Sequence, residues 1–243
     1  MIISAQITSV GGRSRNEDTV WTEWSPEGFL GIVADGLGGH GGGQIASREA
    51  AASFAEDYLQ KRLLTREQFE TAFEKAGKRV EKKQSPQCSM KTTSVILTVE
   101  NRTARWAHTG DSRLYHFFEN RLVSQTMDHS VSQMAVLMGE ITPDQIRFHE
   151  DRNRVLRALG SENWEPTIAP AIPVDDGFHA FLLCTDGFWE YVYEKEMEET
   201  LRYAANPDEW LGRMEKLLLG RVKANNDNYT ALAVFIKAEE VWK

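Results

Sequence analysis

The order of strand-like and helix-like segments is the feature that most constrains the fold of this 243-residue chain. Apolar periodicity predicts a group of strands, a pair of helices, more strands, a second helix pair and a last strand. The expected strands cover residues 3–7, 20–24, 29–34, 92–99, 104–108, 113–118, 179–184 and 229–236, and the expected helices lie near 51–59, 65–80, 194–204 and 207–219. Because strands and helices are segregated rather than alternating, the order favours an α+β fold with antiparallel sheets over a doubly wound parallel sheet.

Local signals indicate where several of these elements begin and end. Thr65 and Gln68 form a capping box at the start of the second helix. Asn101 and Asn120 mark hairpin turns. Residues 130–160 are helical in character but irregular. No internal repeat or low-complexity linker divides the sequence, so we expect one domain over residues 1–243.

Composition excludes several classes of function. The formal charge of −8 argues against a nucleic-acid partner, which would reward clustered Lys and Arg. No apolar run approaches the roughly 18 residues needed to span a bilayer, and the first residues show neither a basic leader nor a long apolar segment. Two cysteines are too few for a disulfide framework and suit a reducing compartment. We therefore expect a cytoplasmic protein that binds neither nucleic acid nor membranes.

Four aspartates lie where a predicted strand meets a turn, namely Asp35, Asp111, Asp186 and Asp227. A carboxylate in such a position is held by a rigid element while its oxygens face outward, as binding of a hard cation requires. A glycine follows both Asp35 and Asp186, so the backbone can approach a ligand closely and its carbonyl can join the site. Because the pattern offers oxygen ligands without a His or Cys cluster, it points to Mg²⁺ or Mn²⁺ rather than zinc.

Each of these aspartates also has a structural interpretation, since Asp-Gly is a common turn dipeptide and Asp227 could cap a turn. Four such positions, with Glu17 and Asp18 after another strand, are harder to explain one by one. Arg13 precedes Glu17 by four residues in a glycine-containing turn, where its guanidinium can present a bidentate fork to phosphate. Alone it would indicate a surface salt bridge, whereas beside a metal cluster it is the expected phosphate clamp.

Eight short segments follow one another in a defined order. They are GRSRNED (12–18), VADGLGGH (33–40), TTS (92–94), GDSR (110–113), DHS (128–130), RALG (157–160), TDG (185–187) and DNYT (227–230). Together they resemble the metal-dependent protein serine/threonine phosphatases of the protein phosphatase 2C type, particularly the compact bacterial members. The resemblance covers nearly the whole chain, and eight ordered segments are highly specific although each is weak by itself.

The resemblance implies a four-layer sandwich of two antiparallel β-sheets flanked by pairs of helices. It also implies that Asp35 bridges two metal ions, with the Gly36 carbonyl on one of them, and that Asp186 and Asp227 complete the other. Asp111 is similar to the ligand of a weaker third metal, shared with Asp186.

The resemblance assigns roles to residues around this centre as well. Glu17 and Asp18 would hold metal-bound waters, or one of them would ligate directly, and Arg13 would bind the substrate phosphate. A hydroxide bridging two Mn²⁺ or Mg²⁺ ions would attack phosphorus, so no side-chain nucleophile is required. The proton for the leaving oxygen would come from a metal-bound water or from His40, which has an equally good interpretation as a turn residue bonded to a metal ligand. His129 is expected to order its neighbouring loop.

The implied substrate is a phosphorylated protein, dephosphorylated at serine or threonine in opposition to a serine/threonine kinase, and we expect a monomer. The segment 130–160 corresponds to the flap that shapes substrate access. Lys91 stands where the family often has glycine, which affects only the start of a strand. Two alternatives remain: a catalytically silent phosphatase-like binding domain, and a two-metal phosphoesterase acting on small molecules. The glycine-rich turn lacks the lysine of a phosphate-binding loop, which disfavours a nucleotide substrate.

Overall fold

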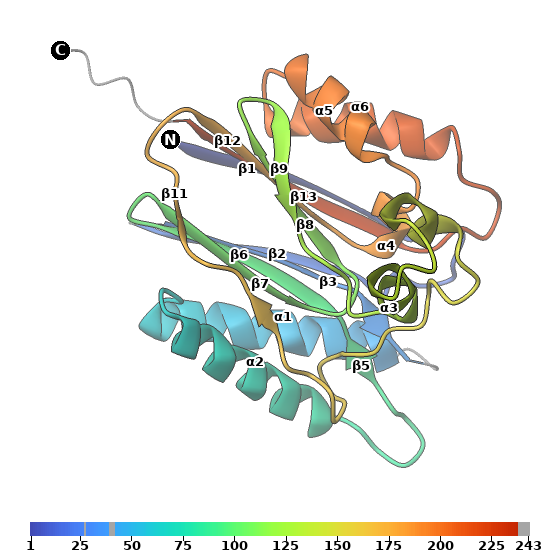
Figure 1. Cartoon of the computed structure of the whole chain (residues 1–243). Coiled ribbons are helices and arrows are strands. Elements are labelled where there is room, and N and C mark those ends of the chain that lie inside the picture. Colours follow the sequence, from blue (N-terminus) through green and yellow to red (C-terminus); the bar gives the residue numbers. More distant parts are fainter. Residues whose placement is uncertain (27, 39–41, 238–243) are drawn as a thin grey trace.

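The computed structural model describes residues 1–26, 28–38 and 42–237, which form four layers (Figure 1). Two antiparallel sheets pack face to face, and a pair of helices covers the outer side of each sheet. The predicted α+β sandwich is therefore confirmed. Strands that follow one another in the sequence pair as antiparallel hairpins within a sheet, and each consecutive pair of helices covers the outer face of one sheet. Segregated strands and helices therefore produce this sandwich.

The first sheet has six strands in the order β10-β7-β6-β3-β2, with β11 also paired to β7. Its strands are β2 (Thr19–Ser25), β3 (Gly28–Ala34), β6 (Ser94–Glu100), β7 (Thr103–Thr109), β10 (Thr167–Ile168) and β11 (Ile172–Pro173). Helices α1 (Gly42–Lys61) and α2 (Arg66–Glu81) cover it. The interior strand β3 is buried along its whole length, which explains why its sequence is continuously apolar rather than alternating.

The second sheet has five strands in the order β1-β13-β12-β8-β9. They are β1 (Ile2–Ser9), β8 (Arg113–Phe118), β9 (Arg121–Gln125), β12 (Phe178–Cys184) and β13 (Tyr229–Lys237), and helices α5 (Glu194–Arg202) and α6 (Pro207–Leu219) cover them. The first and last strands are neighbours, in register from Ile2 opposite Ile236 to Ser9 opposite Tyr229. This pairing brings the loop after β1 next to the segment before β13.

Three apolar clusters hold the layers together. The middle cluster lies between the sheets and includes Phe29, Leu97 and Phe181. One outer cluster joins α1 and α2 to the first sheet through side chains such as Phe54 and Phe73, and the other joins α5 and α6 to the second sheet. Complete burial of such side chains stabilises the fold by about 1.5–3 kcal/mol each. Burial on both faces fixes each sheet rigidly, so the strand ends are rigid supports for a site.

The local signals act as predicted. The Thr65 side chain accepts a hydrogen bond from the Gln68 backbone while the Gln68 side chain accepts one from the backbone of Thr65, which completes the capping box of α2. Asn101 and Asn120 have φ values of 48° and 62°, the left-handed conformation that asparagine tolerates in hairpin turns.

Several features differ from the sequence expectations. The helix α1 begins at Gly42, well before its predicted apolar stripe. A two-strand ladder joins β4 (Gly36–Leu37) to β5 (Lys91–Thr92). The segment after β12 is a helical turn, α4 (Asp186–Trp189), rather than a simple turn. Elements of two to four residues are too short for apolar periodicity to reveal.

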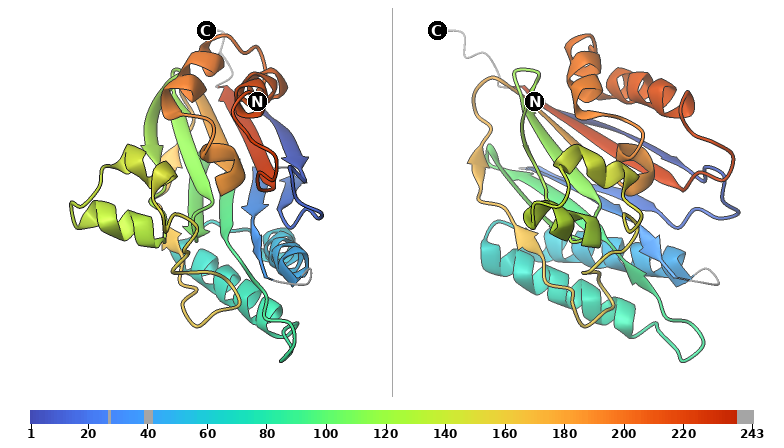
Figure 2. Two further views of the ribbon diagram at one scale, coloured as in Figure 1. Left: turned by 90° about the vertical axis from the view of Figure 1, so that its right-hand side faces the viewer. Right: turned by 45° about the vertical axis from the view of Figure 1, so that its right-hand side comes forward.

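Residues 130–160 form the irregular segment that the sequence predicted. It contains α3 (Val131–Leu137) and the 3₁₀ helix η2 (Pro143–Phe148), and it projects from the side of the sandwich (Figure 2). Leu137, Met138 and Phe148 on this segment are largely exposed. Among the described residues, no helix is both long enough and apolar enough to cross a bilayer.

Candidate active site

A pocket of about 650 Å³ opens at one end of the sandwich and gathers most of the predicted site residues. Its lining includes Arg13, Glu17, Asp35, Gly36, Asp111, Asp186 and Asp227. The topology explains this convergence, because Asp35 follows β3, Asp111 follows β7, Asp186 follows β12, and Asp227 precedes β13, the antiparallel neighbour of β12. Asp18 does not line the pocket. It is buried behind it, where its Oδ2 accepts a hydrogen bond of 2.9 Å from the Thr185 hydroxyl.

Two threonines just before β6 fix the backbone of Asp35. The Asp35 carbonyl accepts hydrogen bonds from the Thr93 amide at 2.9 Å and from the Thr92 hydroxyl at 2.7 Å. The Asp35 amide donates to the Thr93 hydroxyl at 3.1 Å. At Gly36 a Cβ atom would lie 2.2 Å from the carbonyl oxygen of Gly43, so only glycine fits where the start of α1 packs against this turn. The carboxylate is thereby held at a fixed position.

A similar arrangement holds the pair on the second sheet. The Asp186 Oδ1 atom accepts from the Gly187 amide at 2.6 Å, and the Asp227 Oδ1 atom accepts from the Asn228 amide at 2.9 Å. A Cβ atom on Gly187 would lie 2.0 Å from the Asn228 carbonyl oxygen. The start of α4 and the start of β13 therefore lie in direct backbone contact, with one aspartate on each.

Asn228 ties the loop after β1 to this contact. Its side-chain amide donates to the carbonyls of Val10 at 2.8 Å and Arg15 at 2.9 Å, and its Oδ1 accepts from the Glu17 amide at 2.8 Å. Asn228 is buried, and each of these bonds spans more than 200 residues of sequence. We did not single out this residue from the sequence except as part of the segment 227–230. Its role depends on the pairing of the first and last strands, which no local pattern shows.

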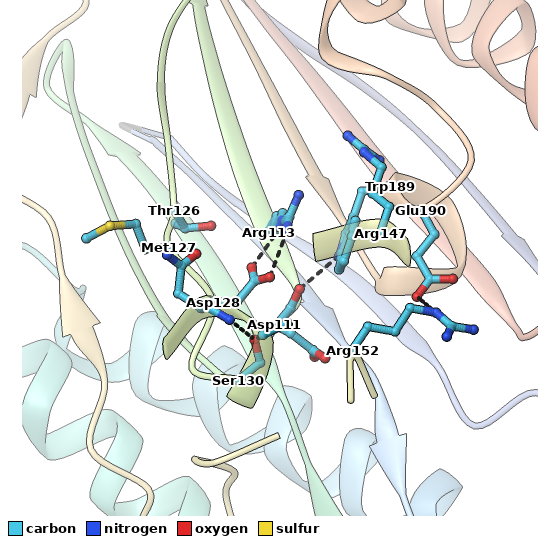
Figure 3. Close-up of polar contacts among 12 residues, drawn as sticks. Asp111, Arg113, Thr126, Met127, Asp128, Ser130, Arg147, Arg152, Trp189 and Glu190 are labelled. Atoms are coloured by element: carbon cyan, nitrogen blue, oxygen red, sulfur yellow. Dashed lines mark hydrogen bonds and ion pairs between the residues drawn. The ribbon is translucent and has the colours of Figure 1, made fainter. Parts of the chain in front are cut away.

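Asp111 lies beside a buried polar network, shown in Figure 3. Its side chain is almost completely buried and its Oδ1 atom has no hydrogen-bond partner among the described residues. Its backbone carbonyl accepts from the Trp189 indole at 2.9 Å, which links the end of β7 to α4. A buried carboxylate oxygen without a partner is costly unless a cation or water compensates it, so this atom is available as an oxygen ligand.

The Trp189 ring connects Asp111 to the 130–160 segment (Figure 3). The Arg113 guanidinium lies 3.5 Å from the Trp189 ring centroid and forms a bidentate ion pair with the Asp128 carboxylate at 2.8 and 2.7 Å. The Arg147 guanidinium, carried by η2, is 5.6 Å from the same centroid. The sequence indicated Asp128 and Arg113 only as family segments and did not predict their contact.

Two further ion pairs anchor the 130–160 segment near the pocket. Arg147 contacts Glu194 at 2.5 Å, and Arg152 contacts Glu190 at 3.0 Å. Glu190 follows α4, and Asn153, next to Arg152, lines the active-site pocket. The segment is thereby fastened to the same short helix that carries Asp186.

Burial and mutual repulsion raise the pKa values of the clustered carboxyls. Burial, followed by repulsion from neighbouring aspartates, holds the pKa values of Asp35 and Asp186 well above their usual range. Burial raises the pKa of Asp18 to about 7 and that of Asp111 to about 7. Ionised carboxylates that lie this close repel one another. A bound multivalent cation stabilises their ionised form, because it replaces this repulsion with attraction to the cation.

Arg13 is at the pocket but pairs with Asp227, at 2.8 Å between Nη2 and Oδ2. Both side chains of this pair are about half exposed. His129 holds the turn before Asp111, because its Nδ1 accepts from the Gly110 amide at 3.2 Å and its Nε2 is 2.9 Å from the Thr167 hydroxyl. This is the ordering role expected for it. His40 lies outside the described residues.

The residues present fit divalent cations of the Mg²⁺ or Mn²⁺ class. Among the described residues, no three acidic, histidine or cysteine side chains converge on one point as a ready-made ligand set. Ions held through one or two carboxylates, waters and a backbone carbonyl do not need such a set, and Mg²⁺ usually keeps several waters. The oxygen-rich lining and the unpartnered Asp111 Oδ1 atom match that mode of binding.

Comparison with known proteins decides the family. The protein phosphatase 2C family model matches residues 10–218. The chain belongs to the protein phosphatase 2C family. A serine/threonine phosphatase, stp, from Listeria welshimeri is 33% identical over 215 residues, which cover 84% of this chain and 82% of that protein. The resemblance drawn from the eight segments is confirmed.

Solved structures of serine/threonine phosphatases have the same fold. The crystal structure of the Mycobacterium tuberculosis serine/threonine phosphatase PstP/Ppp has a TM-score of 0.82 and 28% identity, and covers 97% of this chain and 99% of that one. The catalytic domain of PstP has also been solved in complex with two manganese ions, with a TM-score of 0.79, 26% identity, and coverage of 96% of this chain and 97% of that one. The fold therefore occurs with a two-manganese centre.

Proposed function

We propose that this chain is a metal-dependent protein serine/threonine phosphatase that hydrolyses phosphoserine and phosphothreonine. The observation that carries the proposal is the single pocket in which Arg13 and four aspartates from both sheets converge. Family membership and the named activity of its relatives support the same reaction. Mn²⁺ or Mg²⁺ is the cofactor.

The side chains of the pocket divide into ligands and supports. Asp35, Asp186 and Asp227, with the Gly36 carbonyl, would hold two ions, and Asp111 with Asp186 would hold a weaker third. When bound, the ions supply a water of lowered pKa and positive charge against the phosphoryl oxygens. Glu17 lines the pocket and Asp18 lies behind it, so Glu17 would orient water directly and Asp18 would act through Thr185.

Arg13 would bind the phosphate by exchanging partners. Its ion pair with Asp227 is about half exposed, and pairs of this kind contribute only about 0–1 kcal/mol. A phosphate dianion can accept two hydrogen bonds from the guanidinium, whereas Asp227 accepts one, and it carries more charge. The side chain can therefore leave Asp227 for the substrate at little cost, which also frees an oxygen of Asp227.

The proton for the leaving oxygen remains assigned to His40 or a metal-bound water. His129 is excluded from that role by its surroundings: both ring nitrogens are engaged, and burial lowers its pKa to about 3. A group with such a low pKa carries no transferable proton near neutrality.

Hydrolysis of an aryl phosphate and of a phosphothreonine peptide tests the proposal. We expect activity with Mn²⁺ or Mg²⁺, none with chelator, and a loss of at least about 100-fold in Asp35→Asn. Asp208→Asn, in an exposed first turn of α6, is the matched control and should retain activity. Activity without metal, or undiminished in Asp35→Asn, would contradict the mechanism.

The two alternatives make different predictions. A silent binding domain would hydrolyse neither substrate. The presence of all four aspartates and Arg13 in the pocket argues against this alternative. A small-molecule phosphoesterase would prefer a nucleotide monophosphate to the phosphothreonine peptide. We expect the peptide to be preferred.

Several finer assignments belong to the same proposal. We propose that residues 1–243 act as one catalytic domain, as a monomer in the cytoplasm, on proteins phosphorylated by a serine/threonine kinase in a signalling circuit. The free state of Cys88 and Cys184 suits a reducing compartment.

A further inference from the structure

A second pocket of about 520 Å³ adjoins the active-site pocket. The two pockets share Leu37 and Val155, which therefore lie at the boundary between them. The second pocket is also lined by Glu81, Gln84, Lys91, Leu156, Arg157 and residues 158 and 160–163. A chain bound with its phosphorylated residue at the aspartates can therefore continue into this pocket, which we call the side groove.

Two cations lie at the end of the side groove that meets the active site. Lys91 pairs with Leu37 in the β4–β5 ladder, and Arg157 is two residues beyond Val155. Both side chains belong to exposed residues, and within the described part of the chain neither forms an ion pair. The Arg157 guanidinium makes one hydrogen bond, of 3.3 Å, to the Glu165 carbonyl. The chain as a whole has a net charge of −8, so two cations without an ion pair beside the active site form a local positive region on an acidic protein.

Two carboxylates lie at the other end of the side groove. Glu81 is the last residue of α2, and Glu162 follows the turn at Gly160. Gln84 joins the segment before Lys91 to the turn at Gly160, because its side-chain amide donates to the carbonyls of Met90 at 2.9 Å and Gly160 at 2.6 Å. In Figure 1 the end of α2 lies beyond β5, further from α4 and its Asp186. The side groove is thus lined by two cations, Lys91 and Arg157, and by two carboxylates, Glu81 and Glu162.

We propose that the side groove binds the substrate chain beside its phosphorylated residue and selects acidic side chains close to that residue. This inference rests on the proposed phosphatase function. An extended chain advances about 3.3 Å per residue, so the first three flanking residues span about 10 Å and pass Lys91 and Arg157 before the carboxylates. Acidic side chains at these three positions would meet free cations, whereas basic ones would meet like charge. Beyond them the preference weakens or reverses, because Glu81 and Glu162 also line the side groove.

The test compares phosphothreonine peptides that differ only in the three residues on each side of phosphothreonine: aspartate, alanine or lysine. We expect kcat/KM to rise from the lysine to the aspartate peptide by up to about fivefold for each charge engaged, and the ratio to shrink with added salt. Lys91→Glu should lower or invert the ratio, and Lys91→Arg should preserve it. Lys61→Glu makes the same charge change at the far end of α1, about 30 Å from its start, and should leave the ratio unchanged.

Hydrolysis of an aryl phosphate with Mn²⁺, measured on every variant, separates this inference from the proposed function. Equal rates on the aspartate and lysine peptides by an enzyme active on aryl phosphate would overturn the side-groove selection and leave the phosphatase function standing. An equal change of ratio in Lys91→Glu and Lys61→Glu would also overturn it, because the effect would then be one of net charge. Absence of aryl phosphatase activity in the wild type would instead contradict the proposed function itself.

Discussion

At the scale of single residues, the site depends on glycines and an amide as much as on its acids. Gly36 and Gly187 allow backbones from separate elements to approach so closely that no side chain fits between them. Asn228 satisfies three backbone groups of the loop that carries Arg13 and Glu17. These residues place the carboxylates, and the metal and the substrate then meet a preformed arrangement.

Gly187→Ala tests this placement. The added Cβ would lie 2.0 Å from the Asn228 carbonyl oxygen, so α4 and β13 must separate and carry Asp186 and Asp227 apart. We expect a loss of about 1–3 kcal/mol in the free energy of unfolding, as for other overpacked sites, and a loss of most activity. Urea denaturation and aryl phosphate hydrolysis are the measurements.

Gly212→Ala is the control for the glycine substitution. A Cβ at Gly212, inside α6, would meet nothing within 4 Å. Alanine should stabilise the helix there by about 0.5–1 kcal/mol and leave activity unchanged. Equal behaviour of the two alanine variants would contradict the steric account of Gly187.

At the scale of elements, the 130–160 segment is fastened to α4 and to the start of α5 rather than to the sheets alone. Arg147 is buried, contacts Glu194 and lies 5.6 Å from the Trp189 ring centroid. The same Trp189 donates to the carbonyl of Asp111. The position of η2 and the position of a candidate metal ligand therefore depend on one aromatic ring.

Arg147→Met should loosen this attachment. Removing one partner of a buried ion pair costs about 3–5 kcal/mol when both charges are buried, and less here because Glu194 is about one-third exposed. We expect faster proteolytic cleavage within residues 130–160 and a raised KM for the phosphothreonine peptide. Arg121→Met removes an exposed pair with Glu198 and should change neither. Unchanged cleavage in Arg147→Met would argue against this anchor.

The helices and strands also show which parts of the fold and of the candidate site can be predicted from the sequence. Periodicity and capping predicted the long strands and helices because each buries one continuous face or carries its own cap, as at Thr65. The aspartates were predictable because each follows or precedes such a strand. The contacts of Asn228, Trp189 and Arg113 were not predictable from the sequence. Their hydrogen-bond partners are 15 to more than 200 residues away, and only the assembled sheets bring them together. His40 remains a prediction.

At the scale of the whole molecule, the interior holds neutral histidines as well as repelling acids. Burial and the neighbouring His179 lower the pKa of His116 to about 4, and its ring stacks on Phe181 at 4.5 Å between centroids. The unfolded chain binds a proton near pH 6.5 and the folded chain does not, so stability is present above pH 6.5 and is lost as pH falls toward 4. The raised pKa values of Asp18 and Asp111 act in the opposite direction, because the folded state holds those protons more tightly.

Comparison with His116→Phe isolates the histidine contribution. Phenylalanine keeps the stacking but cannot be protonated, and the aspartates are the same in both proteins. We expect wild-type stability, relative to the variant, to fall by up to about 1.4 kcal/mol per pH unit between pH 6.5 and 4. Urea denaturation across this range is the measurement. A stability difference that does not vary with pH would show that His116 is not held neutral.

The central claim is that aspartates from both sheets form one divalent-cation centre. Calorimetric titration with Mn²⁺ at neutral pH, on the wild type and on Asp35→Asn, tests it most directly. We expect two ions to bind to the wild type, with release of protons from the carboxyls of raised pKa, and a clear loss of affinity in the variant. Absence of Mn²⁺ binding by the wild type, or equal binding by Asp35→Asn, would contradict it.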